Sequence, residues 1–232
     1  MNAPFDVYAE SYDSALNQGL AVSGEARDYF LHGRVDWLKG RLEALKLTAE
    51  KVLDYGCGTG SSVPELKTKL NAMDVVGVDL SAKEIDVARR TVALGRFFAM
   101  NDFVPSRDRD LVYCNGVFHH VPPPERAAAI KYVFEALRPG GLFALWENNP
   151  WNPGTRYVMS KIPFDHDAIT LSAPETRRLV QSAGFEVLST DFLFIFPRPL
   201  RALRALEPRL ARLPLGAQYV VLAQRPAGRP PR

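Results

Sequence analysis

A glycine-rich loop with a preceding acid is the stretch of the sequence best suited to ligand chemistry. The loop VLDYGCGTG, residues 52–60, joins an apolar run to the start of a helix. Its Asp54 is followed by three alternating glycines, Gly56, Gly58 and Gly60. Glycines adopt backbone angles that other residues avoid, and they let a ligand approach the main chain closely. A strand, a glycine loop and a helix start together form a nucleotide-type binding turn.

Asp79 is the second residue whose position suggests ligand binding. It follows the apolar run 73–78 and lies 23 residues after Gly56, near the ~20 expected for an acid that holds ribose hydroxyls. The alternating glycines depart from the dinucleotide pattern G-x-G-x-x-G. With Asp54 ahead of them and an acid ending the second strand, residues 50–150 resemble class I S-adenosylmethionine-dependent methyltransferases. A glycine turn without a ligand is the alternative.

The resemblance implies a cofactor site at the carboxyl ends of the strands, where open α/β sheets bind ligands. Backbone N–H groups of the glycine loop would meet the methionine carboxylate, Asp54 would face the ammonium group, and Asp79 would accept both ribose hydroxyls. Asp102 and Phe103 follow the third strand, where the family binds adenine. The cofactor residues implied in this way are Tyr12, Asp54, Gly56, Cys57, Gly58, Asp79, Leu80, Asp102, Phe103 and Asn115.

Three side chains are candidates for taking a proton from a methyl acceptor. His119 and His120 follow the fourth expected strand, and Glu147 ends the fifth. Methyl transfer from a sulfonium mainly requires in-line alignment, and a base is needed when the acceptor holds a proton. We expect His119 to face the substrate as the base, His120 to pack, and Glu147 to be the next candidate. A hydrogen-bonded histidine at the sheet rim is the alternative for either histidine.

Alternating strand and helix signals position these side chains. Strands are expected at 51–55, 75–79, 96–100, 110–114, 142–146, 185–196 and 218–224, and helices at 24–46, 62–70, 124–137, 174–183 and 199–213, with a further helix after Ser81. Capping boxes are expected at Ser62 with Glu65 and at Ser81 with Glu84. This alternation predicts an α/β fold, a Rossmann-like, doubly wound, mostly parallel seven-stranded sheet. The resemblance implies an antiparallel edge strand.

We expect one methyltransferase domain over residues 1–232. Its parts would be an N-terminal helical segment (1–48), a cofactor-binding core (49–147), a cap insert (148–173) and a C-terminal helix and strands (174–232). The aromatic residues before position 24 would either fold over the cofactor or pack as an arm. The cap insert contains prolines, and its residues show no clear helix or strand periodicity.

The composition is that of an ordinary globular protein, with 47% hydrophobic and 24% charged residues. A net charge of +3 is too small to indicate nucleic acid. Cys57 and Cys114 have neither a disulfide-scaffold pattern nor a metal-ligand spacing, which favours a reducing compartment and no metal. We find no signal-peptide pattern and no run of ~18 apolar residues that predicts a membrane span. A cytoplasmic protein is therefore expected.

The segment 199–213 alternates leucines with arginines, and Pro208 must bend or end any helix there. The favoured interpretation is a helix packed by its leucines with solvated arginines. Weak association with a membrane surface, or contact with an anionic substrate, is the alternative.

The resemblance implies a methyltransferase that uses S-adenosylmethionine on a small molecule. A hydroxyl oxygen is the preferred acceptor because a histidine base is available, while nitrogen and carbon stay open. One alternative is an RNA or protein methyltransferase, against which the mild charge and the lack of an added binding domain count. Another is a non-catalytic cofactor-binding protein. No nucleic-acid partner is expected, and the protein would be a monomer or a homodimer.

Overall fold

The computed structural model describes residues 23–165 and 167–228, so Tyr12 and the segment expected to cover the cofactor lie outside the described residues. Within those ranges one sheet contains seven strands, in the order β3-β2-β1-β4-β5-β7-β6. The strands are β1 (Lys51–Tyr55), β2 (Asp74–Asp79), β3 (Arg96–Ala99), β4 (Arg109–Asn115), β5 (Leu137–Asn148), β6 (Glu186–Leu193) and β7 (Gln218–Gln224).

The first five strands pair in parallel, and β7 runs antiparallel to both of its neighbours, β5 and β6. This confirms the Rossmann-like, mostly parallel sheet. The antiparallel pair of β6 and β7 lies at the edge, with β6 outermost. Because β1, β2, β4 and β5 run in the same direction, their carboxyl ends meet at one edge of the sheet, and this edge holds the expected site.

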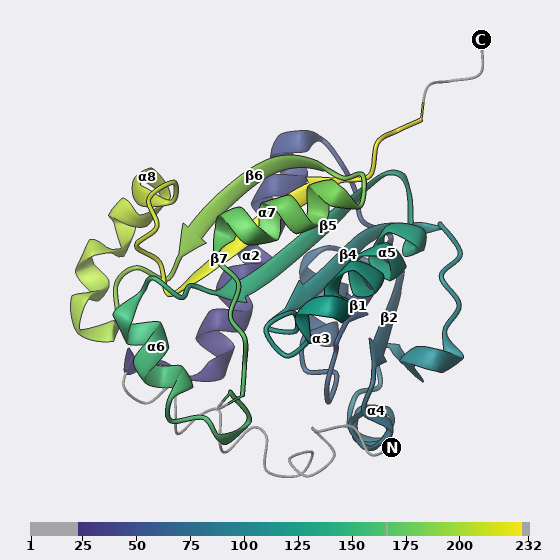
Figure 1. Ribbon diagram of the computed structural model, residues 1–232, viewed down its shortest axis with the longest axis horizontal. Helices are drawn as coiled ribbons and strands as arrows, with labels where there is room; N and C mark the ends of the chain where they lie inside the picture. The colour runs from purple at the N-terminus through teal and green to yellow at the C-terminus, as the bar shows by residue number, and fades with distance from the viewer. Residues whose placement is uncertain (1–22, 166, 229–232) are drawn as a thin grey trace.

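Helices cover both faces of the sheet (Figure 1). The first face carries α2 (Arg27–Leu45), α3 (Val63–Lys69) and α4 (Ala82–Thr91), and the second carries α5 (Arg126–Ala136) and α7 (Ala173–Ser182). Leu38 of α2 and Trp146 of β5 belong to the core of the first face, whereas Val133 of α5 and Leu145 of β5 belong to that of the second. Both faces of the central strands are therefore buried, as their apolar runs require.

The two predicted helix caps have different outcomes. At α3 the capping box is wrong, because the Ser62 hydroxyl donates to the Asp54 carboxylate at 2.6 Å instead of capping. The Ser62 backbone is also helical rather than extended. At α4 the Ser81 hydroxyl accepts a hydrogen bond from the Glu84 N–H at 3.2 Å, which confirms the Ser81 half of the predicted capping box.

The segment after β5 contains a helix that the sequence pattern missed. It is α6 (Pro153–Met159), capped by Asn152, whose side-chain oxygen accepts from the Thr155 N–H at 3.0 Å. Three short 3-10 helices also escaped prediction: η3 (Met100–Asp102), η4 (Pro123–Glu125) and η5 (Pro163–Asp165). No helix among the described residues is long and apolar enough to cross a membrane.

The last helical segment also departs from the expected single helix over 199–213. It consists of a 3-10 helix, η6 (Arg198–Leu206), and a short α8 (Glu207–Leu210), with Pro208 tolerated in the first turn of α8. The expectation that its leucines pack is wrong, because most of them are exposed.

Strand β6 is shorter than predicted because Phe194 has a left-handed backbone (φ 62°) that ends the strand at Leu193. The Phe194 ring lies over Gly33 of α2, where a Cβ would be only 2.6 Å from the ring. A side chain at position 33 would therefore displace Phe194, a residue that lines the cavity described below.

Candidate active site

The glycine loop folds back onto the end of β2 and is fixed there by backbone and carboxylate contacts. The N–H groups of Gly56 and Cys57 both donate to the Val78 carbonyl, at 2.8 and 3.0 Å. Asp79 accepts from the Gly58 N–H at 2.9 Å and from the Ser81 N–H at 2.8 Å. Asp79 thus holds the loop in place at the carboxyl end of β2.

Asp54 lies below the loop and is 1% exposed. Burial raises its pKa to about 7, and the hydrogen bond from Ser62 only partly offsets this. A carboxyl with such a pKa becomes fully ionised when a cation approaches it. Asp54 is therefore suited to the place that the sequence assigned to it, near the ammonium group of the cofactor.

Asn115, at the end of β4, carries a buried side-chain oxygen without a hydrogen-bond partner among the described residues. A buried, unpaired oxygen costs free energy unless a ligand donor completes it. Asn115 also borders two cavities, a large one toward the cap and a small one of about 70 Å³ that Arg34 and Ser62 line as well. This oxygen is the clearest sign that a donor group binds at the end of β4.

Other implied cofactor residues fall at the same edge of the sheet with different exposures. Leu80 is 66% exposed at the end of β2, available to pack against a ligand. Asp102 lies in η3 and is exposed. The centres of the Phe103 and Phe98 rings are 5.8 Å apart. Cys57 is buried in the core, so its backbone alone can face a cofactor.

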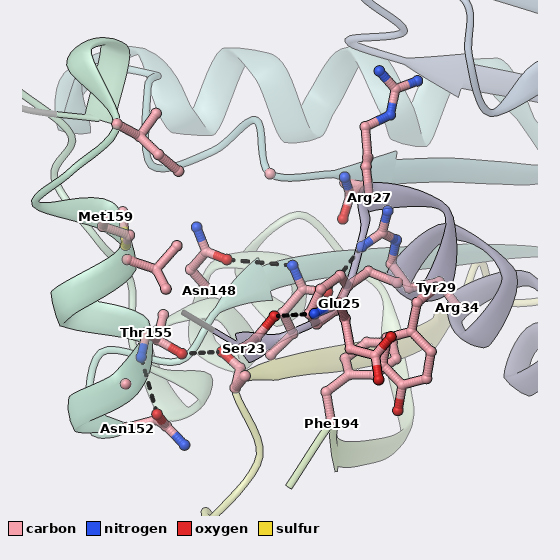
Figure 2. A pocket seen from close by; sticks show the side chains of 18 of the residues that line it. Ser23, Glu25, Arg27, Tyr29, Arg34, Asn148, Asn152, Thr155, Met159 and Phe194 are labelled. Atoms are coloured by element: carbon pink, nitrogen blue, oxygen red, sulfur yellow. Dashed lines mark hydrogen bonds between the residues drawn. The ribbon is translucent and has the colours of Figure 1, made fainter. Parts of the chain in front are cut away.

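A cavity of about 310 Å³ opens beside Asn115, a size within the range of small-molecule sites. Its walls come from the start of α2, the turn after β4, the segment 148–165 and residues 194–197. In Figure 2 the side chains of Asn152, Thr155 and Met159 lie across the cavity from Arg27 and Arg34. Many of the wall residues are apolar, among them Tyr29, Phe30, Val158, Met159, Ile162, Phe164, Phe194, Ile195 and Phe196.

His119 and Glu147 form a buried ion pair at the cavity wall. The Nδ1 atom of His119 lies 2.6 Å from one Glu147 oxygen, and the other Glu147 oxygen accepts from the Phe118 N–H at 2.7 Å. Burial alone would lower the His119 pKa, but the charge of Glu147 and contacts with Asp165 outweigh it and raise the pKa to about 10. Both ring nitrogens of His119 thus face carboxylates and the raised pKa favours its charged form at neutral pH, so we rank His119 below its neighbour as a base. Glu147 is also fully engaged.

His120 is the better candidate for a base. Burial and the neighbouring positive His119 lower its pKa, so it is neutral at pH 7. Its Nε2 atom lies 3.3 Å from the Asp165 carboxylate, whose pKa is lowered by hydrogen bonds with both histidines despite its burial. A neutral imidazole oriented by a carboxylate is the usual arrangement of a general base. The sequence reasoning missed Asp165, because nothing in its local pattern links it to the histidines.

His119, His120 and Asp165 have the residue types of a metal site, and their ligand atoms lie within 4.8 Å of one another. The contacts, however, already account for the cluster. The charged His119 lies between Glu147 at 2.6 Å and Asp165 at 3.6 Å. We therefore interpret the group as an ion-pair network that fixes His120.

The cavity's arginines already have partners in the protein. Arg34 donates to the Tyr113 hydroxyl and to the Gln218 side chain, both at 3.0 Å (Figure 2 shows Arg34). Arg204 pairs with Glu25 at 2.8 Å. The Arg204 charge is therefore partly neutralised before any ligand binds, whereas the hydrogen bonds of Arg34 to neutral groups hold it in place without neutralising it.

Comparison with known proteins agrees with this geometry. Residues 52–141 match the family model described as a methyltransferase domain. The chain is 28% identical to a trans-aconitate 2-methyltransferase of Rhodopseudomonas palustris (strain BisB5), over 72% of this chain and 60% of the relative. It is 32% identical to an uncharacterized methyltransferase of Staphylococcus carnosus (strain TM300), over 59% of this chain and 62% of the relative. The chain thus matches less than two thirds of the length of these relatives.

Solved structures share the fold. A S-adenosylmethionine-dependent methyltransferase from Mesorhizobium loti superposes with a TM-score of 0.59 at 22% identity, over 84% of this chain and all of that one. A TehB-like methyltransferase from Corynebacterium glutamicum superposes with a TM-score of 0.62 at 19% identity, over 95% of this chain and 98% of that one. The unpaired Asn115 oxygen and the Asp79-anchored loop fit the cofactor that this fold family uses. Residues 52–141 thus form a methyltransferase domain with the class I S-adenosylmethionine-dependent fold, and S-adenosylmethionine is the cofactor of this domain.

Proposed function

We propose that the protein methylates a hydroxyl oxygen of a small molecule whose body is largely apolar. The single observation that carries this proposal is the His120–Asp165 pair, at 3.3 Å, in the wall of the cavity that also contains Asn115. Donor and acceptor would meet there. The remaining support is the cavity's size of about 310 Å³, which suits a metabolite rather than a folded macromolecule.

S-adenosylmethionine supplies a methyl group bound to a positively charged sulfur. Asn115 would hold the cofactor's donor groups, and Asp54 would face its ammonium. Asp165 keeps the His120 ring in one orientation, and His120 accepts the acceptor's hydroxyl proton on its unprotonated ring nitrogen. The bound cofactor would supply the methyl group to the acceptor oxygen, leaving its sulfur neutral, and His120 would hold the acceptor's proton until it is released to water.

The acceptor's apolar body follows from the cavity's lining. Phe194, Ile162 and Met159 contribute apolar surface, while Arg34 and Arg204 are engaged by protein partners. A compact polyanion would need cations that are available to it. We therefore propose that this chain's acceptor differs from the tricarboxylate for which the R. palustris relative is named.

A carboxylate acceptor is the second candidate. It is favoured by the name of that relative and by Arg34, which lines both cavities. A carboxylate is already ionised and needs no base. The two candidates therefore differ in their dependence on His120.

Methyl transfer from radiolabelled S-adenosylmethionine to separate pools of metabolites, lipids, RNA and protein tests the proposal. Label should enter an organic-soluble small molecule and resist mild alkaline hydrolysis, which cleaves methyl esters but not methyl ethers. Alkali-labile label would favour the carboxylate candidate. Label in RNA or protein alone, or cofactor binding without transfer to any pool, would contradict the proposal.

A further inference from the structure

The segment formed by η6, α8 and the following turn exposes leucines. Five of them between residues 200 and 215 are 41–49% exposed among the described residues: Leu200, Leu203, Leu206, Leu213 and Leu215. We call this stretch the leucine segment. Apolar side chains that gather at the surface in this way mark a contact with another apolar phase or surface.

The backbone of η6 places leucines and arginines on different sides. A 3-10 helix has three residues per turn, so side chains three apart in sequence lie above one another. The backbone is non-helical at Leu200 (φ −102°, ψ 19°), and the regular part follows it. Leu203 and Leu206 therefore share one side, and Arg201 and Arg204 share another.

Two of the three η6 arginines, Arg198 and Arg204, contact the protein. The Arg204 guanidinium lies 4.4 Å from the centre of the Tyr29 ring, pairs with Glu25 at 2.8 Å and donates to the Phe196 carbonyl. Arg198 donates to the Gly24 carbonyl at 3.3 Å. These contacts fix η6 with its leucines outward, which is the reverse of an ordinary surface helix.

The charge of the leucine segment indicates the kind of surface it meets. Residues 198–215 contain five arginines and one acid, Glu207, whose carboxylate accepts from the Phe196 N–H and is therefore engaged within the protein. Arg201 and Arg209 are exposed and form no ion pair with any described residue. A second copy of this chain would bring two arginine-rich segments together, at a cost in repulsion. Anionic lipid headgroups above an acyl layer match both the leucines and the arginines.

We propose that the leucine segment docks this protein on the surface of an anionic membrane. The leucine side chains enter the boundary between headgroups and acyl chains, and Arg201 and Arg209 contact lipid phosphates. This docking needs no membrane-spanning helix and does not depend on the proposed reaction.

Docking would bring the cavity close to the lipid. Phe196, Pro197 and Arg204 line the cavity and lie in or beside η6. Figure 1 shows α8 and α6 at the same end of the molecule, and α6 contributes Thr155 and Met159 to the cavity. An acceptor with an apolar body would therefore reach the site from the membrane surface.

Co-sedimentation of the full-length protein with vesicles tests this proposal. Vesicles of phosphatidylcholine containing phosphatidylglycerol should bind the wild type, and added salt should weaken the binding. The double variant Leu203→Ser/Leu206→Ser should bind about tenfold or more weakly, because it removes two apolar side chains from the contact. Arg201→Glu/Arg209→Glu should lose the preference for anionic vesicles.

Matched controls change equally exposed residues elsewhere. Leu94→Ser, at a leucine that is 43% exposed, and Arg90→Glu, at an exposed arginine of α4, should bind as the wild type does. Circular dichroism confirms that each variant is folded. The proposal is overturned if the wild type fails to bind anionic vesicles, or if the double leucine variant binds as well as the control. A wild-type dimer that the leucine variant dissociates, without vesicle binding, would assign the segment to self-association instead.

Discussion

The His119 imidazole and the Glu147 carboxylate form a buried ion pair, 2.6 Å apart, that joins the turn after β4 to the end of β5. Both residues are at most 3% exposed. Because the second Glu147 oxygen accepts from the Phe118 N–H, the pair also fixes the backbone that leads to His120. His119 therefore positions the loop that carries its neighbour His120.

Replacing His119 with Gln should lower the free energy of unfolding by about 3–5 kcal/mol, because it leaves the Glu147 charge buried without its partner. The folded-state pKa of about 10 lies above the ordinary 6.5. The stabilisation by His119 is therefore complete below pH 6.5 and is lost as the pH rises from there to about 10. Urea denaturation of both proteins from pH 6 to 10 should show the difference between them shrinking across that range.

His32 provides the matched control for this pair. Its Nε2 atom lies 3.2 Å from Glu65, but its side chain is 51% exposed. His32→Gln should change the free energy of unfolding by about 0–1 kcal/mol. Equal effects of the two substitutions would show that burial does not strengthen the His119 pair.

His120→Ala should reduce turnover by ~10²–10⁴-fold, while cofactor affinity measured by calorimetry stays nearly constant. Only the neutral ring can accept a proton, and the His120 pKa is lowered. The rate should therefore fall only at a pH below the ordinary histidine pKa of 6.5, and this limb should vanish in the variant. In Asp165→Asn the limb should move to lower pH, because Asp165 raises the His120 pKa. Unchanged turnover in His120→Ala would contradict the base assignment and favour an ionised acceptor.

Much of the fold could be predicted because its signals are local. β1 and β7 have the bounds that their apolar runs indicated, and the seven-stranded sheet follows from the alternation of strands and helices. Features set by distant contacts could not be predicted. The Ser62 hydroxyl donates to Asp54 instead of capping α3, and Arg204 of η6 turns toward the protein because Tyr29 and Glu25 bind it.

In the candidate site, too, features with a local sequence signal could be predicted and features set by distant contacts could not. Asp54, Asp79 and Asn115 lie at strand ends, so their order along the chain was enough to bring them together. The roles of the two histidines depend on Glu147 and Asp165, which are 27 and 45 residues beyond His120. Adjacent histidines in a sequence carry no sign of which one is buried between carboxylates, and this is why the sequence alone ranked His119 first.

Asn115→Ala should weaken the binding of S-adenosylmethionine about 5- to 150-fold, because a donor of the cofactor loses its acceptor. The unliganded protein should be at least as stable as the wild type, since the Asn115 oxygen is buried without a described partner. Calorimetry and thermal unfolding measure the two effects. Gln181→Ala, at an exposed position of α7, is the control that should change neither quantity. A loss of stability without a loss of affinity would assign Asn115 a structural role.

Cofactor affinity should depend on the ionisation of Asp54. Burial raises the pKa of this carboxyl from 3.8 to about 7 in the folded protein, so an approaching ammonium must first displace its proton at lower pH. Affinity for S-adenosylmethionine should therefore rise between pH 5 and 7, by up to tenfold per pH unit, and Asp54→Asn should remove this dependence.

The raised pKa of Asp54 also means that the unliganded protein loses stability as the pH rises from about 4 to 7, since the folded state holds a proton that the unfolded state releases. Asp54→Asn should flatten that slope too. Isothermal calorimetry and denaturation over the same pH range measure both quantities, and a slope in affinity that persists in Asp54→Asn would place the titrating group elsewhere.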